Sequence, residues 1–188
     1  PNPTPVISGD NSVCANETGV VYSTPAAGGR TYVWAIAGGV ITGGAGSNSI
    51  TVTWGAAGAG TLQLTETITA TTCAVTTGLY NVTINANPTP VIAGNATVCS
   101  NATGVVYSTA NVIGNTYAWT VGGGSITAGA GTNSITVTWG AAGAGTVQLV
   151  ETVSASGCFT STANYNVTVN PNPTPVISGD NSVCANET

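Results

Sequence analysis

The apolar residues of this chain alternate with polar ones at a period of two. In the stretch SNSITVTWG, Ile50, Val52 and Trp54 share one face, while Thr51 and Thr53 take the other. This period is typical of a half-buried β-strand and differs from the 3.6-residue period of a helix. Four further runs, rich in Val, Ile, Tyr and Thr, favour strands over residues 19–24, 31–39, 61–69 and 79–85.

Glycine-rich turns separate these runs, at residues 26–29, 43–49 and 55–60. Short strands with a turn every 8–12 residues or so are typical of a β-sandwich. The pattern therefore predicts an all-β fold, with a sandwich of about seven strands over residues 1–85.

The chain is a tandem repeat. The segment NPTPV at residues 2–6 returns at 87–91 and 172–176, and cysteines and tryptophans recur at the same interval. Internal repeats of this kind indicate an array of structural units. We expect three units, arranged end to end: a sandwich over 1–85, a second over 86–170 and the start of a third over 171–188.

The third unit is identical to residues 1–18, whereas it differs from residues 86–103 at several positions. The sequence therefore favours a larger repeat that is two modules long and spans 1–170, seen as one window of a longer array. The alternative is a polymer subunit with a duplicated end segment that joins it to its neighbour. In either case the prolines of NPTP restrict the backbone, so we expect a short, stiff linker between units.

The five cysteines allow two pairings that respect the repeat. One pairs Cys14 with Cys73 and Cys99 with Cys158, and leaves Cys184 for a partner outside the window. The staggered pairing joins Cys73 to Cys99 and Cys158 to Cys184, and leaves Cys14 for an upstream unit. We favour the first, because a sandwich of this size has a marginal core that a disulfide would support. Disulfides also indicate an extracellular or periplasmic compartment.

Composition excludes several classes of function. The net charge is −5, only 4% of residues are charged, and Arg30 is the single basic residue, so nucleic acid is not an expected partner. No apolar run reaches the ~18 residues of a membrane span. The chain has no His, and its six acidic residues are scattered, so we expect no enzyme activity, no cofactor and no metal site.

The remaining candidate residues are aromatic or acidic. Ten of the eleven aromatic residues recur at the repeat interval, which favours core packing over a glycan-binding platform. The predicted core tryptophans are Trp34, Trp54, Trp119 and Trp139. Glu66 and Glu151 share strand phase with apolar residues, so we expect a buried or interface carboxylate at each, held by a structural contact; calcium ligation is the second interpretation.

The order Y-x-W, then GGVITGGAGSNSITVTWG at 38–55, together with Cys14 and Cys73, resembles the PKD-like modules repeated in large secreted surface proteins of Bacteroidota. The resemblance implies immunoglobulin-like sandwiches, export to the cell surface and a role as a stalk, spacer or adhesive repeat. We therefore expect a non-catalytic structural repeat of an extracellular filament, stalk or giant adhesin, with neighbouring modules and chains of the same protein as partners. The alternative is a module that binds carbohydrate or another cell surface.

Overall fold

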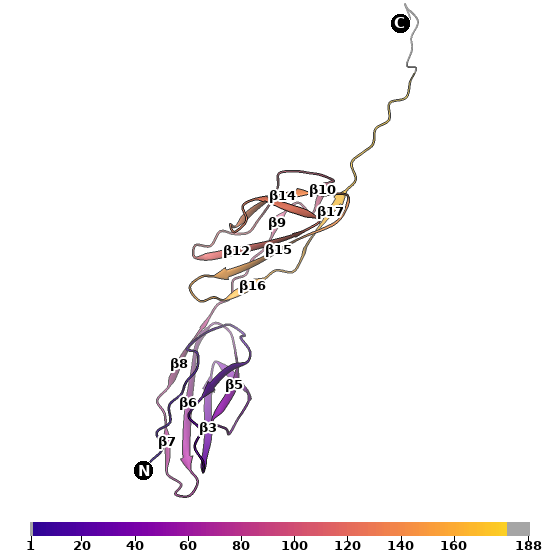
Figure 1. Ribbon diagram of the computed structural model, residues 1–188. Helices are drawn as coiled ribbons and strands as arrows, with labels where there is room; N and C mark the ends of the chain where they lie inside the picture. Colours follow the sequence, from indigo (N-terminus) through magenta and orange to yellow (C-terminus); the bar gives the residue numbers. More distant parts are fainter. Residues whose placement is uncertain (1, 180–188) are drawn as a thin grey trace, which may run out of the picture.

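The computed structural model describes residues 2–179. Within them the chain forms strands and no helix, so no segment there is a helix long and apolar enough to cross a membrane. The prediction of an all-β fold in tandem sandwiches is confirmed. Figure 1 shows two sandwiches that follow one another end to end.

The first module contains a five-stranded and a three-stranded sheet. The larger sheet has the order β1-β8-β6-β3, and β7 pairs with the C-terminal part of β6, beyond the residues that pair with β8. The smaller sheet has the order β2-β5-β4. All pairs are antiparallel except β1 and β8, which run parallel. The strands are β1 (Ser12–Cys14), β2 (Val20–Ser23), β3 (Arg30–Ala37), β4 (Gly39–Gly43), β5 (Ser49–Trp54), β6 (Gly58–Ile68), β7 (Ala74–Thr76) and β8 (Tyr80–Asn85).

The second module repeats this arrangement, with sheets ordered β10-β17-β15-β12, plus β16 on β15, and β13-β14-β11-β9. The extra strand β9 corresponds to a single bridge between Ser8 and Ser23 in the first module. The strands are β9 (Ala93–Gly94), β10 (Thr97–Cys99), β11 (Val105–Ser108), β12 (Asn115–Gly122), β13 (Gly124–Ala128), β14 (Ser134–Trp139), β15 (Gly143–Val153), β16 (Phe159–Ser161) and β17 (Tyr165–Asn170).

Each module has its own core between its two sheets. The alternation read from the sequence is visible in β5, where Ile50, Val52 and Trp54 are buried and the residues between them are partly exposed. The ring of Trp54 fits because Gly60 faces it: a Cβ at Gly60 would lie 2.4 Å from Trp54 Cζ3. The glycine pattern predicted a turn at Gly60, but β6 begins earlier, at Gly58.

The chain enters and leaves each module at opposite ends (Figure 1). The first module begins near the end that carries β7, and β8 leads out at the far end toward the second module. The segment after β17 likewise leaves the second module at the end away from the first. Successive modules of this fold therefore extend in one direction.

Candidate functional site at the junction between the modules

One disulfide joins the two modules. Cys14, the last residue of β1, is bonded to Cys158 in the turn before β16, with their Cα atoms 5.5 Å apart. The two cysteines are 144 residues apart in the sequence, and Cys158 is fully buried. The bond therefore crosses the junction that the linker also crosses.

Strand pairing explains why these two cysteines meet. The parallel pairing of β1 with β8 sets Cys14 opposite Asn85, the last residue before the linker. In the second module a tight turn presents Cys158 at the entry end: the Val153 N–H donates to the Cys158 carbonyl, and the Gly157 N–H donates to the Val153 carbonyl, both at 2.8 Å. Each cysteine thus lies at the edge of its module that faces the other.

The favoured pairing of Cys14 with Cys73 and of Cys99 with Cys158 is wrong in the structure. Cys73 lies in the turn between β6 and β7, at the entry end, whereas Cys14 lies at the exit end beside β8. A bond within one module would have to span the length of the sandwich. The staggered pairing is also wrong, because Cys158 is bonded to Cys14, and Cys73 and Cys99 are free and exposed. Cys184 lies outside the described residues.

The linker is held to the loop that carries Cys14. Asn87 Nδ2 donates to the Ala15 carbonyl at 2.9 Å, and Asn85 Nδ2 donates to the Val13 carbonyl at the same distance. Pro88 and Pro90 follow, and both are partly buried. The Cys14–Cys158 disulfide is a second covalent connection beside this linker.

A hollow of about 680 Å³ lies between the linker and the near end of the second module. The linker forms one wall, and residues 109–115 and 151–156 contribute to the rest. Val91 and Ile113 give it an apolar surface, and Ile113 is 98% exposed. Its polar lining includes Glu151, which is 3% exposed and accepts a hydrogen bond from Asn115 Nδ2 at 2.6 Å.

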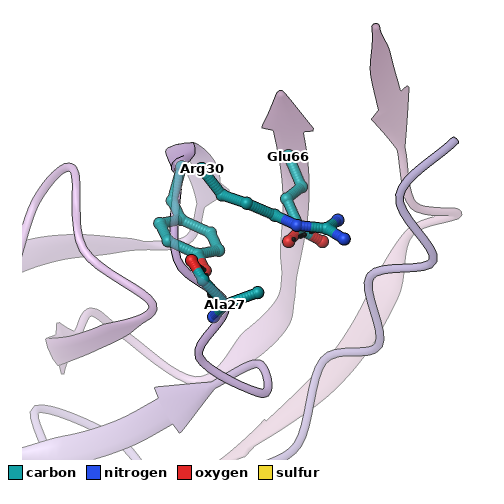
Figure 2. A network of polar contacts seen from close by, with 4 residues as sticks. Ala27, Arg30 and Glu66 are labelled. Carbon is teal, nitrogen blue, oxygen red and sulfur yellow. Dashed lines mark hydrogen bonds and ion pairs between the residues drawn. The ribbon is translucent and has the colours of Figure 1, made fainter. Parts of the chain in front are cut away.

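Glu66 is the counterpart of Glu151 in the first module, and Figure 2 shows it beside Arg30. It points inward, as its strand phase predicted, and is 4% exposed. Its partner is Arg30, whose Nη1 lies 3.0 Å from Glu66 Oε1. Beside the pair, the Ala27 N–H donates to the Tyr32 hydroxyl at 3.0 Å. Among the residues that the structure describes, no group of three or more His, Cys, Asp or Glu side chains could hold a metal ion.

The tryptophans predicted for the core occupy two kinds of place. Trp54 and Trp139 are almost completely buried at the centres of the modules, while Trp34 and Trp119 lie nearer the surface and donate from Nε1 to the carbonyls of loop residues 47 and 132. Trp54 Nε1 also donates to the Tyr22 hydroxyl, which donates to the Asp10 carbonyl.

Burial raises the pKa of Tyr22 to about 12, and it raises the pKa of Tyr107, the counterpart of Tyr22, in the same way. Both phenols therefore stay neutral in the folded protein well above neutral pH. Among the described aromatic side chains only Phe159, next to Cys158, is largely exposed, at 63%.

Solved structures share the fold at low sequence identity. A C-terminal fragment of intimin, solved in complex with the intimin-binding domain of the translocated intimin receptor, matches with a TM-score of 0.50 and 12% identity, over 89% of this chain and 64% of that one. This chain thus spans less than two thirds of the fragment. The fibronectin(III)-like modules of CbhA from Clostridium thermocellum match with a TM-score of 0.41 and 10% identity, over 88% of this chain and 95% of that one.

Domains 4 and 5 of the S-layer protein SbsC match with a TM-score of 0.35 and 16% identity, over 90% of this chain and 98% of that one. A comparison with curated protein sequences gave no match. The intimin fragment, with the TM-score of 0.50, shares the immunoglobulin-like fold with this chain and shows nothing beyond that fold.

A comparison with protein families is more specific. The PKD-like domain matches twice in succession, over residues 1–84 and 85–169. The two matches cover most of the chain and agree with the resemblance seen in the sequence. The chain belongs to the PKD-like domain family.

Proposed function

We propose that this chain is a structural, non-catalytic repeat of an extracellular stalk or filament, of the kind formed by large surface proteins of Bacteroidota. Its repeating units are residues 1–85 and 86–170, with residue 171 opening a third. Its partners are neighbouring modules and chains of the same protein.

The junction disulfide is the observation that carries this proposal. A flexible tether needs only a linker, whereas Cys14–Cys158 adds a second covalent connection to the proline-containing linker. Two connections at one junction resist the hinge and twist motions that a single linker permits. Entry and exit at opposite ends of each module then favour an extended rod.

The same bond supports a location outside the cytoplasm. Structural disulfides persist in oxidising compartments and are rare where thiol reductants are abundant. The low charge content supports assembly, because a net charge of −5 over 188 residues gives weak repulsion between neighbouring modules.

The buried carboxylates support a structural role rather than catalysis. Glu66 is engaged by Arg30, and Glu151 by Asn115. Each therefore has a partner that satisfies it in place, as buried charged groups require.

Small-angle X-ray scattering of the oxidised chain tests the proposal. We expect the distance distribution of one elongated particle, which broadens when Cys14 and Cys158 are both replaced by serine. The variant with Cys73 and Cys99 replaced by serine is the matched control and should scatter like the parent chain, because those cysteines take no part in the junction. Broad, bead-like scattering from the oxidised parent would refute the rod, and glycan binding by a tethered adhesin would become the better explanation.

A further inference from the structure

Cys73 and Cys99 are the repeat counterparts of the two bonded cysteines, yet both are free and exposed. Cys99 occupies the position in the second module that Cys14 occupies in the first, and Cys158 corresponds to Cys73 in the same way. The junction bond thus uses the exit cysteine of one module and the entry cysteine of the next. Cys73, at the entry end of the first module, and Cys99, at the exit end of the second, take no part in this bond.

The surroundings of Cys99 reproduce those of Cys14. Cys99 ends β10 opposite Asn170, as Cys14 ends β1 opposite Asn85. The residue after each cysteine donates its N–H to that asparagine's carbonyl, at 2.7 Å for Ser100 and 2.8 Å for Ala15. The exit loop of the second module is therefore already shaped like the bonded loop of the first.

The chain also leaves the second module as it leaves the first. Asn172 Nδ2 donates to the Ser100 carbonyl at 3.2 Å, which repeats the contact of Asn87 with Ala15. Pro173 and Pro175, in contrast to Pro88 and Pro90, are exposed. The second exit thus repeats the contact between linker and cysteine loop that is seen at the first.

The surroundings of Cys73 reproduce those of Cys158. The Ile68 N–H donates to the Cys73 carbonyl at 2.9 Å, and the Thr72 N–H donates to the Ile68 carbonyl at 2.8 Å, as Val153 and Gly157 do in the second module. Thr72 has a φ of 56° and Gly157 a φ of 75°, so both turns use the left-handed conformation just before the cysteine.

We infer that Cys99 forms a disulfide with the cysteine at the position of Cys73 in the following module. In the same way, Cys73 forms one with the cysteine at the position of Cys99 in the preceding module. This inference rests on the proposed array. Every junction between modules then carries a disulfide, and junctions of the Cys14–Cys158 type alternate with junctions of the Cys99–Cys73 type. At the Cys14 junction the Cys14 N–H donates to the Glu17 carboxylate at 2.7 Å, whereas Ala102 occupies that place beside Cys99.

The bond forms by thiol–disulfide exchange with a low-molecular-weight disulfide as oxidant. One cysteine thiolate attacks a sulfur of oxidised glutathione, forms a mixed disulfide and releases one glutathione thiolate. The second cysteine thiolate then displaces the other glutathione. The two protein thiols together lose two electrons and two protons, and the oxidant is reduced to two glutathione molecules.

A longer chain tests the inference directly. Residues 1–170 are fused to the N-terminus of the 188-residue chain, so that the join reads as the native sequence around Asn170. Three substitutions remove the other unpaired cysteines: Cys73→Ser in the first unit, and Cys99→Ser and Cys184→Ser in the second. Cys99 of the first unit and Cys73 of the second are then left on the two sides of the central junction. The protein is refolded with reduced and oxidised glutathione, alkylated, and digested with chymotrypsin under denaturing, non-reducing conditions.

We expect an intact mass without alkyl groups and a peptide pair that links Cys99 to Cys73, alongside the Cys14–Cys158 pair. In the control with Cys99→Ser in the first unit as well, one alkyl group should appear, on Cys73. Alkylation of both Cys99 and Cys73 in the test chain, or a bond from either to Cys14 or Cys158, overturns the inference. X-ray scattering from the same sample distinguishes this inference from the proposed function. A rigid rod without the Cys99–Cys73 bond would refute only the disulfide, and a flexible chain with the bond would refute only the rod.

Discussion

Replacing Arg30 with alanine would leave the Glu66 carboxylate in the first module without its partner. The Glu66 side chain is 5% exposed and that of Arg30 is 25% exposed, so the pair is largely but not completely screened from water. Loss of a hydrogen bond between charged groups costs about 1.5–3 kcal/mol, and breaking a fully buried pair costs about 3–5 kcal/mol. For this half-open site we expect Arg30→Ala to lower the free energy of unfolding by about 2 kcal/mol.

The second module supplies the matched control. Asn115 stands at the position of Arg30 and binds Glu151 Oε1 at 2.6 Å. Arg30→Asn should therefore keep a donor for Glu66 and cost less than about 1 kcal/mol. Adding Glu66→Gln to Arg30→Ala removes the unpaired charge and should recover part of the loss.

Hydrogen exchange followed by mass spectrometry measures these differences within one molecule. Peptides from β3 and β6 report opening of the first module, and those from β12 and β15 serve as the unchanged reference. Equal destabilisation by Arg30→Ala and Arg30→Asn, or no effect of either, would refute the reasoning that Glu66 needs a buried donor.

Single positions elsewhere in the first module give three more predictions. Gly60→Ala puts a Cβ 2.4 Å from Trp54 and should lower the urea midpoint, at a cost of about 1–3 kcal/mol, while Gly78→Ala, with no atom within 4 Å of the added Cβ, should not. Thr72→Gly relieves a β-branched residue at φ 56° and copies Gly157, so urea unfolding should show about 1 kcal/mol of added stability. Burial raises the pKa of Tyr22 to about 12, whereas the phenol of the unfolded chain has the ordinary tyrosine pKa of about 10. With free thiols alkylated, stability to urea should therefore stay level below pH ~10 and fall as pH rises toward ~12, less steeply in Tyr22→Phe.

The strands could be predicted because their burial follows a local rule. Ile50, Val52 and Trp54 alternate in the sequence and are buried together in β5. The same rule predicted that Glu66 points inward. It did not identify Arg30 as the partner, because that requires the register of β3 on β6. In this register Tyr32 lies opposite Glu66, and Arg30 lies two residues before Tyr32, opposite Ile68.

The cysteine pairing could not be predicted from the repeat. Any pairing that is carried unchanged from one module to the next satisfies the period equally well. The choice depends on which end of the sandwich each cysteine occupies. That depends on the parallel pairing of the three-residue strand β1 with β8, and Ser12–Cys14 is too short for alternation to mark it as a strand.

The most direct test of the junction is a disulfide map of the oxidised 188-residue chain. Free thiols are alkylated in denaturant, and chymotrypsin, which has aromatic cleavage sites between successive cysteines, releases the linked peptides for mass spectrometry. The structure predicts a peptide pair that contains Cys14 and Cys158, with Cys73 and Cys99 alkylated. Pairs that join Cys14 to Cys73 and Cys99 to Cys158 would contradict it, because each module would then be closed on itself and only the linker would cross the junction.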